Sequence, residues 1–317
     1  MRLRFIAIAC LLSSAAVASA ADSTLLKFVM PDAKVVSGIN VDSIMLTPFG
    51  QFFLSLLPAP DQGFEQAMSM TGFYPRRDIH EIVMASPAEP GKKTGLLLVR
   101  ADFDKERILE LLKAVGKTPE VYGGSEMLAS PGSSNKISQA VAFLGNSVIA
   151  AGDVDSVKGA IDRSRTAATL DAALLAKIAT VSANRDVWVL STASISSFAK
   201  SVQNSHVSGA LQGDLIKGIQ QSSGGVKFGS TIEVSGELTT RSNEDASSLA
   251  SVVQFFMNMA QGNSGASGHP ELNSLVHNLT VHADSNAVKV SLSIPEADLE
   301  TIVKVSQHTG TRKAPRI

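Results

Sequence analysis

The sequence has one cysteine, few aromatic residues and no long apolar run beyond its N-terminus. Cys10 is the single cysteine among 317 residues, so a chain without its N-terminal segment would contain no thiol nucleophile, disulfide or cysteine metal site. Charged residues make up 18% and hydrophobic residues 44% of the chain, which is typical of a packed domain and not of a disordered one. After the N-terminus, no stretch is long and apolar enough to predict a membrane-spanning helix.

An excess of charge of either sign is also missing. The formal net charge is −1 with histidine neutral, and it would become only −3 if Arg2 and Arg4 were removed with the N-terminal segment. Such a balance gives no electrostatic reason to expect an anionic polymer or an anionic membrane surface. We therefore expect no nucleic-acid partner.

The first twenty residues have the three parts of a secretory signal peptide. Two arginines precede an apolar run over residues 5–17, and residues 18–20 read Ala-Ser-Ala, the small-x-small form that signal peptidase cuts. We predict cleavage after Ala20 and export to the periplasm or the extracellular space. An uncleaved anchor and a lipoprotein signal at Cys10 are the alternatives.

A hairpin that leads into a helix, over residues 140–163, has the clearest local pattern. Two β-prone runs flank the turn pair Gly145-Asn146. Asp153 then precedes apolar residues at helical spacing, where an N-cap residue is expected. Asp153 and Asp155 also resemble the start of a calcium loop, but the following positions lack its oxygen ligands and glycine, so we interpret Asp153 as a cap. A weaker copy of the pattern spans residues 276–305.

The order of expected strands and helices repeats at a spacing of about 140–150 residues, which suits duplication of a domain-sized unit. Most consecutive strands are connected as hairpins, so we predict an α+β fold of two tandem related halves, with antiparallel sheet or sheets and helices packed on one face. In the second half, Gly224 and Gly225 predict a turn between a helix over 214–221 and a strand region over 228–239. The predicted units are a signal peptide (1–20), a first half (21–165), a bridging helix (166–183), a second half (184–306) and a flexible basic tail (307–317).

Three passages carry a resemblance to a known kind of protein. They are Pro31-Asp32-Ala33, Gly38-Ile39-Asn40-Val41-Asp42 and the passage from Gly152 to Ile161. With them the chain resembles uncharacterised exported bacterial proteins that are built from a duplicated α+β unit, a domain of unknown function. The resemblance covers most of the chain after the predicted signal peptide. It implies an exported α+β protein, and it assigns no activity and no catalytic residue.

One motif invites a catalytic interpretation. Gly262-Asn263-Ser264-Gly265-Ala266 resembles the nucleophile elbow of serine hydrolases, but it follows an expected helix and not a strand, and Ala266 replaces the final glycine. We interpret the segment as a loop, and we keep a serine-type hydrolase based on Ser264 and a histidine such as His269 as an alternative. The histidines show no metal-binding spacing. We expect no catalytic residue, no metal and no cofactor.

The densest apolar set lies over residues 49–57. We interpret it first as a helix buried between the sheet and a neighbouring element, and second as a greasy surface or groove for a lipid, an acyl chain or a partner protein. Soft side chains over residues 252–259 would then form the facing wall. The predicted ligand-binding residues are Phe49, Phe52, Phe53, Leu57, Phe255, Phe256 and Met259.

These observations predict an exported, non-enzymatic binding or envelope-associated protein. A carrier of a hydrophobic ligand, either a lipid or an acyl chain, is the narrower alternative, and a serine-type hydrolase is the less favoured one. The expected partner is a hydrophobic small molecule or an envelope protein.

Overall fold

The computed structural model describes residues 23–56, 60–88, 94–130, 132, 138–166, 170–193, 214–263, 278–301 and 303. The predicted signal peptide, the predicted basic tail and the segment that holds Ser264 and His269 lie outside these residues.

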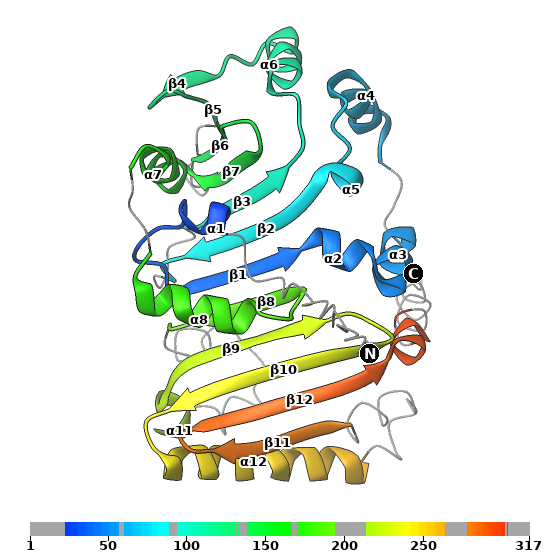
Figure 1. Ribbon diagram of the computed structural model, residues 1–317, viewed down its shortest axis with the longest axis vertical. Helices are drawn as coiled ribbons and strands as arrows, with labels where there is room; N and C mark the ends of the chain where they lie inside the picture. Colours follow the sequence, from blue (N-terminus) through cyan, green and yellow to red (C-terminus); the bar gives the residue numbers. More distant parts are fainter. Residues whose placement is uncertain are drawn as a thin grey trace, which may run out of the picture.

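Twelve strands of the described residues form one antiparallel sheet (Figure 1). Their order across the sheet is β11-β12-β10-β9-β8-β1-β2-β3-β7-β6-β5-β4. The strands are β1 (Val35–Asn40), β2 (Ile79–Ser86), β3 (Leu96–Ala101), β4 (Glu120–Tyr122), β5 (Ser125–Ser130), β6 (Gln139–Leu144), β7 (Val148–Asp153), β8 (Val187–Ser191), β9 (Ile219–Lys227), β10 (Thr231–Thr240), β11 (Leu279–Asp284) and β12 (Ala287–Pro295). The α+β fold class with antiparallel pairing, predicted from the hairpin pattern, is confirmed.

The helices are α1 (Ser23–Leu26), α2 (Val41–Met45), α3 (Pro48–Leu56), α4 (Gln62–Thr71), α5 (Pro75–Asp78), α6 (Lys105–Ala114), α7 (Val154–Ser164), α8 (Ala172–Ser182), α11 (Asp214–Lys217) and α12 (Asn243–Asn263). Aspartate side chains cap several of them. Asp61, Asp104 and Asp153 each accept a hydrogen bond from the backbone N–H three residues further on, and so satisfy one donor that the first turn leaves open. The sequence therefore fixes where α4, α6 and α7 begin.

The two halves of the chain repeat one strand order. The first half runs β1-β2-β3-β7-β6 across the sheet, and the second runs β8-β9-β10-β12-β11. In both, a helix follows the third strand, α6 after β3 and α12 after β10. The halves meet where β1 pairs with β8, with Ile39 opposite Val187, so they share a single sheet. The β4–β5 hairpin extends the first half beyond this common order.

The helices pack on both faces of the sheet. Successive strand residues point to opposite faces, and the register places a set of buried residues on one face, against α7 and α8: Ala142, Ala150, Leu98, Val83 and Trp188. Across β9, β10 and β12 the same row continues with polar or small residues, Gly225, Ser235 and Ser291. Helix α12 packs on the opposite face, where Val281 and Val288 are buried against Leu249.

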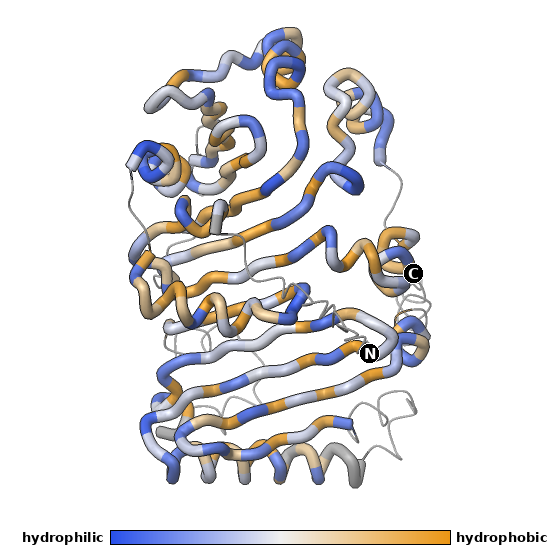
Figure 2. The backbone as a smooth tube through the Cα atoms, in the orientation of Figure 1, coloured by the Kyte–Doolittle hydropathy of each residue, from blue (hydrophilic) through white to orange (hydrophobic). Residues whose placement is uncertain are grey.

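The expectation that the helices lie on one face is corrected by this arrangement. The first half buries one face of the sheet under α7 and α8, and the second half buries the opposite face under α12. The reason is that the buried apolar residues of the two halves point to opposite faces of the sheet. Figure 2 shows how hydropathy differs between the strands, with hydrophobic residues prominent in β3 and pale residues in the middle of β9.

Gly224 and Gly225 do not form the predicted turn. Both lie inside β9 and pair with Gly236 and Ser235 of β10, and the predicted helix over 214–221 is the short α11, after which β9 begins at Ile219. A Cβ atom on Gly225 would lie 2.3 Å from Cδ of Arg185 and 2.4 Å from the carbonyl oxygen of Val187. Glycine is present because neighbouring groups approach the strand closely.

Candidate functional site

An apolar pocket lies between α4, α6 and the strands β5 to β7. Its volume is about 370 Å³, and its main apolar side chains are Met68, Phe73, Leu112, Leu128, Phe143 and Ile149. Ligand pockets usually measure ~300–1,000 Å³ and are mostly apolar with a few polar groups. The pocket therefore has the size and lining of a small-molecule site.

Strand β6 explains why an apolar pocket forms on this face. Ala142 points to the face that α7 covers and is fully buried. Val141 and Phe143 alternate with it, so they point to the opposite face, toward α4 and α6. A strand that is apolar on both sides needs cover on both sides. Ile108 and Leu112 of α6 supply only part of that cover, since Val141 stays 42% exposed.

A polar cavity of about 590 Å³ adjoins the apolar pocket. Thr71 at the end of α4 lines both. Phe103, in the wall of the polar cavity, packs against Phe143 of the apolar pocket with ring centroids 5.5 Å apart. The apolar pocket and the adjoining polar cavity together form a double site, with one apolar part and one polar part. The charged side chains in the wall of the polar cavity are Arg77, Asp78, Asp102, Asp104, Lys105, Glu106 and Arg107.

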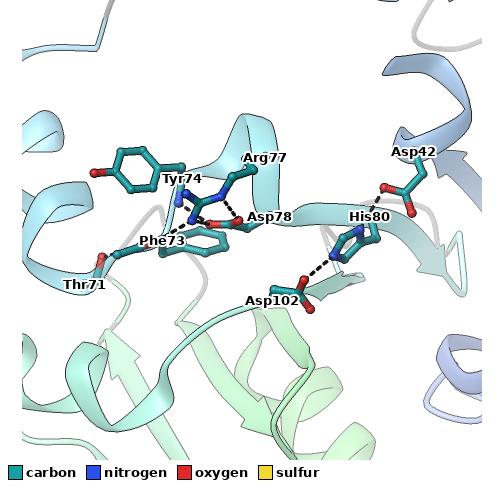
Figure 3. A network of polar contacts seen from close by, with 9 residues as sticks. Asp42, Thr71, Phe73, Tyr74, Arg77, Asp78, His80 and Asp102 are labelled. Carbon is teal, nitrogen blue, oxygen red and sulfur yellow. Dashed lines mark hydrogen bonds and ion pairs between the residues drawn. The ribbon is translucent and has the colours of Figure 1, made fainter. Parts of the chain in front are cut away.

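Arg77 and Asp78 form the shortest ion pair in the wall of the cavity. Nε of Arg77 lies 2.5 Å from Oδ1 of Asp78, and Asp78 also accepts the backbone N–H of Tyr74 at 2.7 Å (Figure 3). The bond from Arg77 lowers the pKa of Asp78, against the opposing effect of burial. Arg77 also donates to the carbonyl oxygen of Gly72 at 3.0 Å, so the pair ties the end of α4 to α5.

His80 lies between two carboxylates. Its Nδ1 is 2.9 Å from Oδ1 of Asp42, and its Nε2 is 3.1 Å from Oδ2 of Asp102 (Figure 3). The hydrogen bond to Asp42 is the largest cause of the raised pKa of His80, and the bond to Asp102 adds to it. Since both ring nitrogens are engaged, a general-base role would first have to break one of these bonds. The arrangement favours a positively charged link between α2, β2 and the segment that enters α6.

The predicted residues of α3 meet an aromatic neighbour from the segment directly after β9. The ring of Phe49 stacks on Phe228 with centroids 5.2 Å apart and an interplanar angle of 5°, and it lies 6.1 Å from the ring of Phe52. Phe53 points more to solvent and is 48% exposed. Leu57 lies outside the described residues.

The structure does not bring α3 and α12 together. Helix α12 packs on β10, β11 and β12, whereas α3 lies near α2 and the end of β1 (Figure 1). On α12, Phe255 is 64% and Met259 is 48% exposed, and the side chain of Phe256 lies outside the described residues. The helix over 252–259 therefore does not form the wall that would face Phe49.

Sequence reasoning missed the residues of the double site. They come from segments between Phe64 and Ile149, and their contacts join elements that are far apart in the chain. One local signal was present: residues 140–144 are apolar at every position and do not alternate with polar residues. Such a run predicts a strand covered on both faces.

A further hollow of about 600 Å³ lies beside α8, on the polar face of β9, β10 and β12. Serines, glycines and charged side chains line much of it, as is usual for a solvated face of an antiparallel sheet. Within the described ranges, no group of three or more histidine, cysteine or acidic side chains is placed to hold a metal ion. In the same part of the chain, no helix is long and apolar enough to cross a membrane.

Neither a family model nor a curated protein matches the sequence. Among solved structures, the chain is similar to crystal form I of TP0453, with a TM-score of 0.47 and 11% sequence identity. That similarity covers 89% of this chain and 97% of the TP0453 chain. A likeness at this level carries no argument about function.

Proposed function

We propose that the protein is a non-enzymatic binding protein that carries a hydrophobic ligand, and that the apolar pocket between α4 and α6 holds the apolar part of that ligand. The apolar pocket is the observation that carries the proposal. Its volume of about 370 Å³ lies near the lower end of the usual ~300–1,000 Å³. That size favours one acyl chain or a compact apolar molecule over a lipid with two chains.

Exposed apolar groups at the pocket support a binding role. Phe64 on α4 is 48% exposed and Val141 on β6 is 42% exposed, and both line the pocket. A ligand chain that covers them removes apolar surface from water on both sides of the contact, and each buried methylene contributes ~0.8 kcal/mol. Part of that gain is offset by the entropy lost on binding.

Export and duplication remain predictions that fit this role. The N-terminal pattern over residues 1–20 supports export, and the repeated strand order of the two halves supports the predicted duplication. An exported carrier would meet lipids or acyl chains in the cell envelope. The hydrolase alternative rests on Ser264 and His269, which lie outside the described residues, so it also remains a prediction.

The proposal is tested by binding of N-phenyl-1-naphthylamine, an uncharged apolar dye whose fluorescence rises in apolar sites. We expect the purified protein to bind the dye, and Leu112→Asp to bind it at least about tenfold more weakly, because a carboxylate in the pocket must lose its hydration when the dye enters. The matched control is Val115→Asp at the C-cap of the same helix, since Val115 is 62% exposed and does not line the pocket.

Circular dichroism shows whether each variant keeps its fold. Equal dye binding by the folded Leu112→Asp and Val115→Asp variants would place the dye elsewhere and overturn the assignment of the pocket. A native protein that binds no dye would overturn the carrier role itself. Native mass spectrometry of envelope-purified protein provides a second readout, with an added lipid mass as the expected result.

A further inference from the structure

Each basic group around the polar cavity pairs with a carboxylate, and His80 also bonds a second carboxylate, that of Asp42, at 2.9 Å. The pairs are Arg77 with Asp78 at 2.5 Å, His80 with Asp102 at 3.1 Å, Lys105 with Glu126 at 3.3 Å and Arg107 with Asp104 at 3.5 Å. Glu106 adds one more carboxylate, which is exposed to solvent and therefore screened by salt. The cavity has many charges but little excess of either sign.

This pairing decides which ligand head the cavity accepts. A head with a net charge would either displace a partner from one of the pairs or leave its own charge without a counterion. Because the side chains of Arg77, Asp102 and Arg107 are 66%, 81% and 60% exposed, each of these costs is modest. A head without net charge has no such cost. It can still form hydrogen bonds, since a guanidinium has five donors and one carboxylate uses at most two of them.

The position of the polar cavity beside the apolar pocket indicates where an uncharged or zwitterionic head of the ligand would lie. Thr71 lines both the cavity and the apolar pocket, so a chain in the pocket leads directly to the cavity. Arg107 extends toward the end of α4, where its Nη1 would lie 3.5 Å from a Cβ atom on Gly72. Arg77 reaches the same turn through the carbonyl oxygen of Gly72. Two arginines therefore flank the junction of the pocket and the cavity.

We propose that the ligand is a single-chain amphiphile with an uncharged or zwitterionic head, whose chain occupies the apolar pocket and whose head lies in the paired-charge cavity beside Arg77 and Arg107. This inference rests on the proposed carrier function and adds the class of ligand to it.

The test compares four amphiphiles with the same twelve-carbon chain and different heads. They are dodecylphosphocholine (zwitterionic), monolauroylglycerol (uncharged), laurate (anionic) and dodecyltrimethylammonium (cationic), each below its micelle concentration. Displacement of N-phenyl-1-naphthylamine from the full chain without its predicted signal peptide reports their affinities. We expect the two ligands without net charge to bind at least about threefold more tightly than both ions, a difference of about 0.6 kcal/mol.

Two variants of one exposed ion pair make the test specific. Arg107→Gln leaves the carboxylate of Asp104 without this partner, so we expect dodecyltrimethylammonium to gain affinity relative to laurate. Asp104→Asn leaves the guanidinium of Arg107 without this partner and keeps a good N-cap for α6, so we expect laurate to gain instead. Opposite changes in the two variants cannot result from a general loss of stability.

The outcomes separate this inference from the carrier function. Equal affinity for all four amphiphiles, or tightest binding of an ion to the native protein, overturns the inference about the head and leaves the carrier function standing. Unchanged preferences in both variants would place the head outside the cavity and also overturn it. If the dye binds to the native protein and none of the four displaces it, the ligand is not an amphiphile of this kind. If the dye itself does not bind, the carrier function fails first.

Discussion

The contact between Gly38 and Trp188 leads to a quantitative prediction about the junction of the two halves. Gly38 lies in β1 opposite Trp188 of β8, and Trp188 is only 3% exposed. A Cβ atom on Gly38 would lie 2.5 Å from both Cε2 and Nε1 of the indole. We therefore expect Gly38→Ala to push the ring out of its place under α8.

The magnitude follows from the overlap. Ordinary van der Waals contacts of a Cβ atom begin at 3.4 Å, so the indole must move by roughly 1 Å in a close-packed core. Overpacking of this kind costs about 1–3 kcal/mol of the free energy of unfolding. With a urea m-value of about 2–3 kcal/mol/M, a loss of about 2 kcal/mol lowers the unfolding midpoint by about 0.7–1 M.

Urea unfolding followed by fluorescence is a direct assay, because Trp188 is the only tryptophan of the chain. We expect a lower midpoint and an emission maximum shifted to longer wavelength in Gly38→Ala. Gly229→Ala is the matched control, since a Cβ atom there meets only the carbonyl oxygen of Thr231, at 3.5 Å, and should change the free energy of unfolding by less than about 0.5 kcal/mol. Equal midpoints for Gly38→Ala and the native protein would show that the indole is not held against β1.

Two further predictions concern charged groups. The pKa of His80 is raised in the folded protein, mainly by its hydrogen bond to Asp42 and also by Asp102. The contribution of His80 to stability is therefore complete below the unfolded pKa of about 6.5 and is lost as the pH rises through the raised folded value. The difference in unfolding free energy between the native protein and His80→Gln should shrink from pH 6 to pH 9, and a constant difference would contradict a stabilising role of the charged imidazole. Asp153 caps α7 and also accepts the backbone N–H of Gly95 at 2.9 Å. Asp153→Ala should lower the free energy of unfolding by about 0.5–2 kcal/mol for the loss of the cap alone, whereas Asp153→Asn should keep most of the stability of the native protein, because asparagine is also a good N-cap. Equal melting temperatures of the two variants in thermal unfolding would contradict the capping role.

The sequence predicted correctly those elements that are set by interactions between residues close together in the chain. The hairpin turn at Gly145-Asn146 is found where the sequence predicted it, because turn chemistry acts over a few residues. The cap at Asp153 is confirmed, because capping also acts over a few residues.

Features that depend on distant neighbours were not predictable in this way. Gly225 looks like a turn residue until Arg185 and Val187 are seen to approach it from another part of the chain. The predicted pairing of α3 with α12 relied on hydrophobicity alone, and hydrophobicity does not say which face or which end of a sheet a helix covers. The double site was missed because its walls come from segments that only the sheet order brings together.

The pairing of β1 with β8 also determines what happens when the two halves are expressed separately. In the intact protein both strands are interior, since β1 pairs with β2 and β8, and β8 pairs with β1 and β9. Cutting the chain between the halves would turn each of them into an open edge with a row of unpaired backbone groups. A separated half is then a template for a second copy of itself, so we expect a truncated chain to fail by strand exchange and aggregation.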